Sequence, residues 1–98
     1  MITVTPEEVE EVLEKEKDLQ IIDIRQYSSF KKSRITGAIS IPRDRIAQFM
    51  HKIKKEKPIL VYCQYGMKSD EIALFMEKKF NTKAYVIDGG YEAYIEAF

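Results

Sequence analysis

Short apolar, β-branched runs alternate with segments of helical periodicity along this 98-residue chain. The strand-like runs lie at 19–24, 37–42, 59–62 and 84–87, and the helical spacing lies at 6–13, 46–55, 69–80 and 91–98. This alternation predicts one α/β domain over residues 1–98, with a mostly parallel central sheet and helices on both faces. In such sheets, functional sites form beside the carboxyl ends of the strands. Residues that directly follow a strand-like run are therefore the first candidates for a site.

Capping residues mark the ends of two predicted helices. Thr5, Pro6 and Glu8 form a capping box with a proline in the first turn, which predicts a helix beginning at Pro6. Ser69 is expected to cap a later helix and Asn81 to end it. The expected inward faces consist of Val9, Val12 and Leu13 in the first of these helices and of Ile72, Phe75, Met76 and Phe80 in the second.

Composition limits the classes of function. Lys plus Arg and Asp plus Glu both number 16, and this balance argues against a dedicated nucleic-acid-binding protein. The longest uninterrupted apolar run, 59–63, is far shorter than the roughly 20 residues that cross a bilayer, so no membrane association is expected. The segment 1–8, MITVTPEE, has acidic residues where an export signal would need a basic region, so no export signal is expected. We therefore expect a cytoplasmic protein whose single cysteine stays reduced.

The single cysteine, Cys63, follows the run 59–62 and precedes the helix that begins near Ser69. A thiol at this place lies beside the first backbone N–H groups of a helix, whose partial positive charge favours the thiolate. Gly66 would let the loop curl with its N–H groups pointing inward, and Lys68 adds a positive charge. The position is equally consistent with a small buried hydrophobic residue that ends a strand.

Four segments resemble, in order, those of the rhodanese (sulfurtransferase) homology domain. They are IIDIR at 21–25, similar to the family's Asp-x-Arg strand; ITGAISIP at 35–42, similar to its Ile-Pro-Gly-Ala-x-x-x-Pro segment; VYCQYGMKS at 61–69, similar to its active-site loop; and VIDGGY at 86–91, similar to its closing Gly-Gly-aromatic motif. Each segment alone is a weak match. Because together they span nearly the whole chain, they imply a single-domain, rhodanese-like fold.

The resemblance implies a sulfurtransferase in which Cys63 attacks the outer sulfur of a donor, such as thiosulfate or a persulfide, and carries it as a persulfide. Backbone N–H groups of the loop would stabilise the anionic sulfur, and this loop consists of Gln64, Tyr65, Gly66, Met67, Lys68 and Ser69. Neither a metal nor an organic cofactor is expected. Since the chain has no second cysteine, an external acceptor such as cyanide, a thiol or another protein must receive the sulfur.

Two departures from the family pattern affect the supporting residues. The acidic residue often found ahead of an aromatic residue is Ser29, so Arg25 loses a carboxylate partner and keeps Asp23 or a backbone carbonyl as its neighbour. Asp23 and Arg25 are therefore interpreted as structural before catalytic, and a supporting role for Arg34 stays open. Lys68 stands where relatives often carry arginine, so the charge remains while the bidentate grip on an oxyanion is lost.

Other classes of function fit part of the same pattern. A catalytically silent, protein-binding module of this fold could share every motif, although Cys63, Gly66 and Lys68 favour the enzyme. A phosphatase or arsenate reductase of this fold needs an arginine six positions after the cysteine, where this chain has Ser69. The phosphatase hypothesis is therefore ranked lower than the hypothesis of a silent binding module.

Basic residues ahead of the second predicted strand suggest a contact with a protein partner. Lys31, Lys32 and Arg34 could dock an acidic sulfur-donor or acceptor protein near the loop. His51 lies off the apolar helix face, has no cysteine or carboxylate at ligand spacing, and is expected to be solvated.

Overall fold

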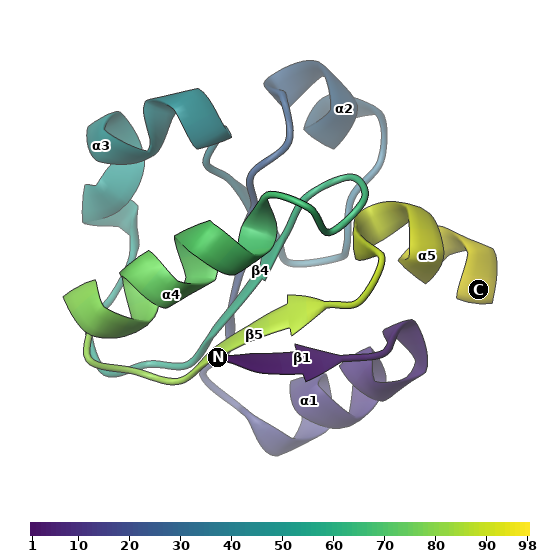
Figure 1. Ribbon diagram of the computed structural model, residues 1–98, viewed down its shortest axis with the longest axis horizontal. Helices are drawn as coiled ribbons and strands as arrows, with labels where there is room; N and C mark the ends of the chain where they lie inside the picture. Colours follow the sequence, from purple (N-terminus) through teal and green to yellow (C-terminus); the bar gives the residue numbers. More distant parts are fainter.

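A five-stranded sheet runs through the centre of the computed structural model, which describes residues 1–98 (Figure 1). Its strands are β1 (Ile2–Val4), β2 (Gln20–Asp23), β3 (Ile39–Ser40), β4 (Ile59–Tyr62) and β5 (Ala84–Ile87), in the spatial order β1-β5-β4-β2-β3. All four pairings are parallel. Because the strands run the same way, the segments that follow β2, β3, β4 and β5 meet at one edge of the sheet.

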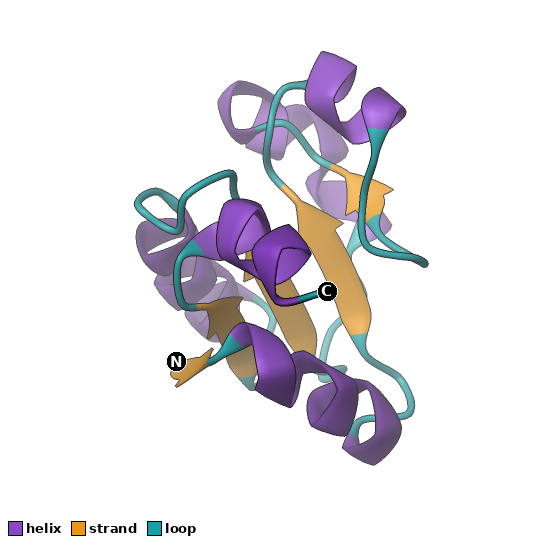
Figure 2. Ribbon diagram, turned by 90° about the vertical axis from the view of Figure 1, so that its right-hand side faces the viewer, coloured by secondary structure: helices purple, strands orange, loops and turns teal.

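Helices cover both faces of the sheet, as the alternating pattern predicts (Figure 2). The helices are α1 (Val9–Lys15), α2 (Tyr27–Lys32), α3 (Ile46–Phe49), α4 (Ser69–Lys79) and α5 (Gly90–Ala97), with 3₁₀ turns at Pro6–Glu8, Arg43–Arg45 and Met50–Lys52. One core lies between the sheet and α3 with α4, and a second lies between the sheet and α1 with α5. The α/β fold is confirmed.

The two-residue period of β4 decides which way its side chains point. Ile59 and Val61 belong to the core beneath α4, whereas Leu60 and Tyr62 belong to the core beneath α5. Cys63 continues the alternation and packs on the α4 side. The strand therefore directs the thiol toward the amino end of the helix that follows it.

Of the two predicted amino-terminal helix caps, one is confirmed and the other is wrong. The capping box is confirmed, because the Thr5 N–H donates to Glu8 Oε1 at 2.8 Å and the Glu8 N–H donates to Thr5 Oγ at 3.3 Å. The Thr5 contacts lower the pKa of Glu8. Ser69 as a cap is wrong: Lys68 is the N-cap, and Ser69 is a buried first residue of α4 whose hydroxyl has no hydrogen-bond partner. Asn81, just beyond α4, has φ of 49°, as a residue that ends a helix often does.

Two predicted inward side chains turn out to be exposed. Leu13 is 36% exposed and Phe75 is 49% exposed, so both lie at the margins of their helix faces. Both helices bury a narrower stripe than their apolar residues suggest. The structure also contains β1 and α2, which the sequence pattern does not predict, and its β2 and β3 are shorter than the apolar runs that contain them.

Candidate active site

Cys63 lies at the carboxyl end of β4 and lines a cavity of about 750 Å³. The other walls come from the segments that follow β2 and β3, including Arg25 and Arg43, and from the loop that contains Gln64 and Lys68. The thiol is buried, with Cys63 only 7% exposed, and one side of it packs against the core. It is thus a deep group that a small molecule can approach from one direction.

The loop after Cys63 points a backbone donor at the sulfur. Gly66 has φ of 83°, and its N–H donates to Cys63 Sγ at 3.1 Å. A left-handed φ suits glycine because it lacks a Cβ atom. The Gly66 N–H is therefore a backbone donor directed at Sγ, the type of group that forms anion-binding sites in enzymes.

The amino end of α5 donates hydrogen bonds to the same loop. The N–H of Tyr91 donates to the Cys63 carbonyl at 2.8 Å, and the N–H of Glu92 donates to the Gln64 carbonyl at 2.9 Å. A Cβ atom on Gly90 would lie 2.5 Å from the Gly66 nitrogen and 2.6 Å from the Cys63 carbonyl oxygen. The closing Gly-Gly-aromatic segment therefore holds the loop carbonyls away from the cavity.

Arg25 is enclosed by partners beside the cavity. Its guanidinium donates to both carboxylate oxygens of Asp23, with the closest pair at 2.7 Å, and to the carbonyl of Ser33 at 2.6 Å. It also donates to Gln64 Oε1 at 3.3 Å and lies 4.1 Å from the centre of the Tyr91 ring. Burial works against its charge, but Asp23 outweighs burial and raises the pKa of Arg25.

Two side chains tie this network to the surrounding core. Gln64 Nε2 donates to Glu92 at 2.9 Å, which links the loop side chain to α5. Tyr62 accepts a hydrogen bond from the Ile35 N–H at 3.2 Å. Burial raises the pKa of Tyr62 far above its ordinary value, so its hydroxyl stays neutral. Hydrogen bonds therefore join the loop after Cys63, α5 and the segment at Ile35 beneath the site.

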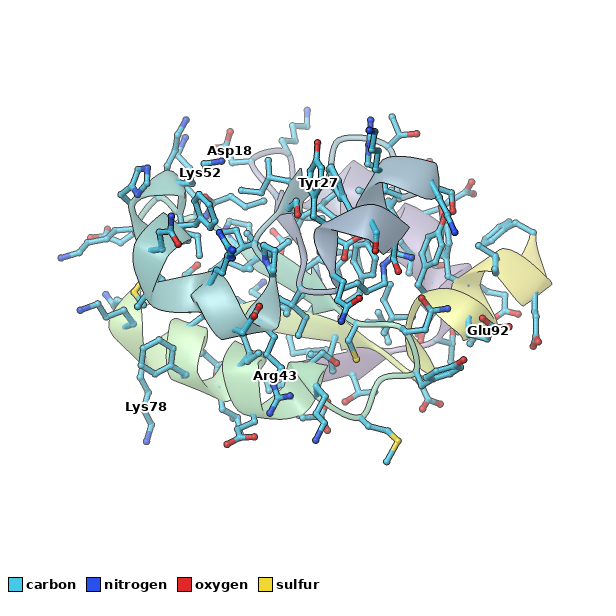
Figure 3. The ribbon with its side chains drawn as sticks, turned by 90° about the horizontal axis from the view of Figure 1, so that it is seen from above. Asp18, Tyr27, Arg43, Lys52, Lys78 and Glu92 are labelled. Carbon is cyan, nitrogen blue, oxygen red and sulfur yellow. The ribbon has the colours of Figure 1, made fainter.

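The outer wall of the cavity carries exposed basic side chains that have no carboxylate partner. Lys68 and Arg43 are exposed, and neither lies within ion-pair distance of a carboxylate. Arg43 is fixed at its backbone, where its N–H donates to the Ile24 carbonyl at 3.0 Å, and it projects from the segment before α3 (Figure 3). Asp44 is the one acidic lining residue. The opening therefore has a net positive charge that suits an anion.

Comparison of the sequence with known proteins shows its family. The family model described as rhodanese-like domain matches residues 5–97. This chain belongs to the rhodanese-like domain family. Two curated relatives carry the name thiosulfate sulfurtransferase GlpE: one from Tolumonas auensis is 39% identical over 74 residues, covering 76% of this chain and 70% of that protein, and one from Coxiella burnetii is 30% identical over 82 residues, covering 84% and 77%.

A solved structure supports the same architecture at lower identity. The rhodanese-related protein from Thermoplasma volcanium has a TM-score of 0.84 and 18% sequence identity, and the match covers 99% of this chain and 93% of that one. At this identity the likeness concerns the fold. It agrees with the all-parallel sheet and the two helical layers of the rhodanese-like domain described above.

The rhodanese-like domain brings some of the predicted site residues together and separates others. Cys63, Arg25, Gln64 and Lys68 line one cavity, while Asp23 is fully buried beneath it. Tyr65 and Met67 form the exposed tip of the loop, at 63% and 82% exposure, and do not line the cavity. Gly66 contributes through its N–H, and Ser69 is buried in the first turn of α4.

Arg34 lies outside the cavity that contains Cys63. Its guanidinium donates to the Phe30 carbonyl at 3.0 Å, stacks 4.4 Å from the Phe30 ring centre and borders a separate polar hollow beside Lys31 and Lys32. The docking of an acidic partner on these three basic residues stays a prediction. His51 is exposed, as expected.

Arg43 is a basic lining residue that the sequence pattern did not single out, and Gln26 and Asp44 also line the cavity without having been predicted. The only local signal for Arg43 is its place directly after Pro42, where the predicted second strand stops. The rhodanese-like domain contains no group of three or more His, Cys, Asp or Glu side chains arranged to hold a metal ion. None of its helices is both long and apolar enough to span a membrane.

Proposed function

We propose that this rhodanese-like domain is a sulfurtransferase in which Cys63 takes a sulfur atom from thiosulfate or a persulfide donor and passes it to an acceptor. The observation that carries the proposal is the contact between Cys63 Sγ and the Gly66 N–H, at 3.1 Å, on the wall of an open cavity. The names of the relatives from Tolumonas auensis and Coxiella burnetii support the same reaction.

The first half-reaction is a nucleophilic displacement at sulfur. The Cys63 thiolate attacks the outer sulfur of thiosulfate, a new S–S bond forms, and the bond to the SO₃ group breaks, with its electron pair leaving on sulfite. The product is a Cys63 persulfide anion. The Gly66 N–H is placed to stabilise it, with the other loop N–H groups of Gln64 to Ser69 as further donors, while Lys68 and Arg43 attract the dianionic donor.

The second half-reaction requires an acceptor from outside the chain. The one cysteine of this sequence is the carrier, so no internal thiol can attack the persulfide. A nucleophile such as cyanide, a small thiol or a protein thiolate attacks the terminal sulfur, and the electron pair of the broken S–S bond returns to Cys63. A reducing, cytoplasmic location fits a reaction that begins and ends with a free thiol.

One observation favours a second candidate, a catalytically silent binding module. Cys63 is buried and belongs to the apolar core beneath α4, which is what a purely structural cysteine would do. A phosphatase or arsenate reductase receives no comparable support, because the position that would need an arginine is Ser69 and its side chain is buried in α4.

Mass spectrometry after incubation with a sulfur donor separates the two candidates. The enzyme gains one sulfur atom from thiosulfate, loses it again to cyanide or a reductant, and shows no gain as Cys63→Ser. Mercaptopyruvate and a small organic persulfide serve as alternative donors in the same assay. Failure of all three donors to load a correctly folded protein would favour the silent module and overturn the sulfurtransferase.

A further inference from the structure

A polar hollow lies at the end of α2 and shares no lining residue with the Cys63 cavity. It has a volume of about 450 Å³, and none of the side chains around it is apolar. We call it the basic hollow, and its lining residues are Lys31, Lys32, Ser33, Arg34, Thr36 and Gly37. Its charge and its position therefore decide what it can bind.

The three cations of the basic hollow have no carboxylate partner. Lys31, Lys32 and Arg34 are exposed, and none of them lies within ion-pair distance of an acidic side chain. The guanidinium of Arg34 is held in place, because it donates to the Phe30 carbonyl at 3.0 Å and lies 4.4 Å from the centre of the Phe30 ring. No acidic residue lines the hollow. The hollow therefore presents a positive surface that suits an anion.

An acidic segment of a polypeptide suits this surface better than one small anion. The three cations stand within the segment 31–34 and are open to solvent. A single exposed ion pair contributes little, because water and salt screen it, whereas several pairs formed together contribute more. A run of carboxylates can meet both lysines and also accept the paired N–H groups of Arg34. Charge complementarity therefore favours an acidic polypeptide.

The basic hollow offers a nucleic acid no surface for base stacking. Proteins that bind single strands hold the bases on aromatic side chains. No aromatic residue lines the hollow, and the Phe30 ring beside it already contacts Arg34 and stacks on Tyr27. Its side chains therefore fit carboxylates better than bases.

Hydrogen bonds join the basic hollow to the wall of the Cys63 cavity. The Ser33 carbonyl accepts from Arg25 at 2.6 Å, and Arg25 also donates to Gln64 of the loop at 3.3 Å. The Tyr91 hydroxyl donates to Ser33 Oγ at 3.0 Å, and the Tyr91 N–H donates to the Cys63 carbonyl. Figure 1 shows α2, α5 and the loop after β4 together at this edge of the sheet. The hollow and the cavity are therefore neighbours, with the Arg25 side chain between them.

We propose that the basic hollow docks an acidic segment of a protein that accepts sulfur from Cys63. This rests on the proposed sulfurtransferase function and names the class of its acceptor. Because Cys63 is buried, a protein thiolate must be held at the mouth of the cavity, and a second contact beside the cavity holds it there. The thiolate attacks the terminal sulfur of the persulfide, a new S–S bond forms, and the electron pair of the old S–S bond returns to Cys63.

Three cysteine peptides of equal length test the docking. Each has one cysteine, a flexible linker and a block of glutamate, glutamine or lysine residues. The protein is first loaded with sulfur from thiosulfate, and mass spectrometry then follows the transfer of that sulfur to each peptide. At low salt the glutamate peptide should react about tenfold faster than the glutamine peptide, after correction for the reactivity of each towards a small persulfide, and high salt should remove the difference. Equal rates at low salt would overturn the proposal.

Variants with reversed charge locate the source of that preference. Lys31→Glu combined with Lys32→Glu should abolish the glutamate advantage and favour the lysine peptide, while discharge of the persulfide to cyanide stays unchanged. The matched control is Lys78→Glu combined with Lys79→Glu, because these lysines are also exposed in the last turn of a helix. The control should keep the full preference, and its loss in both double variants would overturn docking at the hollow. If urea unfolding shows that the reversed variant is unfolded, Lys31→Gln combined with Lys32→Gln should still reduce the preference.

The two proposals fail in different ways. If no donor loads the folded protein, the sulfurtransferase is overturned and the docking role with it. If thiosulfate loads Cys63 and cyanide discharges it, but the peptides react equally, only the docking role is overturned.

Other occupants of the hollow are tested with the Cys63→Ser protein. A labelled glutamate peptide should bind more tightly than a single-stranded RNA of equal charge, and the protein should sediment as a monomer at low salt. Tighter binding of the RNA would assign the hollow to nucleic acid and overturn the proposal. Self-association that Lys31→Glu with Lys32→Glu abolishes would assign the hollow to the acidic α1 of a second copy, and would overturn it as well.

Discussion

The charges beneath Cys63 and the charges above it are organised in opposite ways. Below, Arg25 and Asp23 are buried and satisfy each other, and Gln64 and the Ser33 carbonyl complete the shell around the guanidinium. Above, Lys68 and its neighbour across the opening, Arg43, have no carboxylate partner. A buried cation that is paired with a carboxylate holds the structure, while an exposed cation without a carboxylate partner is left to meet a ligand.

The largest effect should come from breaking the buried pair. Asp23→Asn leaves the Arg25 charge buried without its carboxylate, and the free energy of unfolding should fall by about 3 kcal/mol, the usual cost of removing one partner of such a pair. Urea unfolding measures the change. The control is Asp18→Asn at the exposed pair with Lys57, where the side chains are 71% and 42% accessible and the loss should be no more than about 0.5 kcal/mol.

Equal losses in these two variants would show that burial of the lower pair has no special importance. The turnover rate of Asp23→Asn provides a second measurement. Because Arg25 also contacts Gln64 of the loop, turnover should fall together with stability rather than independently of it.

Bracing of the loop can be tested next through Gly90. In Gly90→Ala the new methyl group would press on backbone atoms of Gly66 and Cys63, so the free energy of unfolding should fall by about 2 kcal/mol and sulfur loading should slow markedly. Gly37→Ala is the matched control. Gly37 also has a positive φ, but its Cβ would meet no atom closer than 3.9 Å. A similar loading rate in the two variants would contradict the bracing role.

Above the thiol, neutralising a free cation should affect the donor and not the fold. Lys68→Met should raise KM for thiosulfate about tenfold, equivalent to about 1.4 kcal/mol, because a charge that attracts the dianion is lost. The free energy of unfolding should stay the same, since Lys68 is exposed and forms no ion pair. Steady-state kinetics at several salt concentrations measure both KM and its ionic-strength dependence.

Lys78→Met provides the control at the other end of α4 (Figure 3). It removes the same charge far from the cavity and should leave KM unchanged. A fall in stability with Lys68→Met, or an equal rise of KM in both variants, would remove the distinction between the upper and lower charges.

Much of this arrangement could be predicted from the sequence because its signals are local. The runs that became β2, β4 and β5 are short, β-branched and bounded by turns, and the Cys63 loop follows the most apolar of them. The capping box at Thr5 needs only three residues of context. The partnership of Asp23 with Arg25 could also be anticipated, since the two residues are next-but-one neighbours at the end of a strand.

The parts that escaped prediction depend on contacts between distant segments. β1 is three residues long with only Val4 buried, and α2 buries no residue fully, so neither has an apolar period to detect. Arg43 reaches the cavity only because β3 lies next to β2 in the sheet, which no local pattern states. Capping preferences predict Ser69 as the N-cap of α4, but the loop geometry makes Lys68 the N-cap.

The smallest expected effect concerns charges at the opposite end of the sheet. Glu16 accepts hydrogen bonds from Lys83 at 2.8 Å and from the Tyr85 hydroxyl at 2.5 Å, and these contacts lower its pKa from the ordinary 4.5. A carboxylate with a lowered pKa stabilises the fold above the unfolded-state value and loses that contribution as the pH falls through the folded-state value. Glu16→Gln should therefore reduce stability at neutral pH, and the difference from the unmodified protein should shrink below about pH 4.5.

Urea unfolding at a series of pH values measures this difference, with Glu14→Gln, an exposed residue of α1, as the control. Sulfur loading should be the same in all three proteins, because Glu16 lies near the amino end of β5, away from Cys63. This pair is half exposed, so it extends the comparison to an intermediate case in which partners are present but burial is not complete. Glu16→Gln could cost as much stability as Asp23→Asn. In that case the number of hydrogen-bond partners, rather than burial, would govern how much each charge stabilises the fold. The difference between the buried Asp23–Arg25 pair and the exposed cations of the active site would then be explained by partner number.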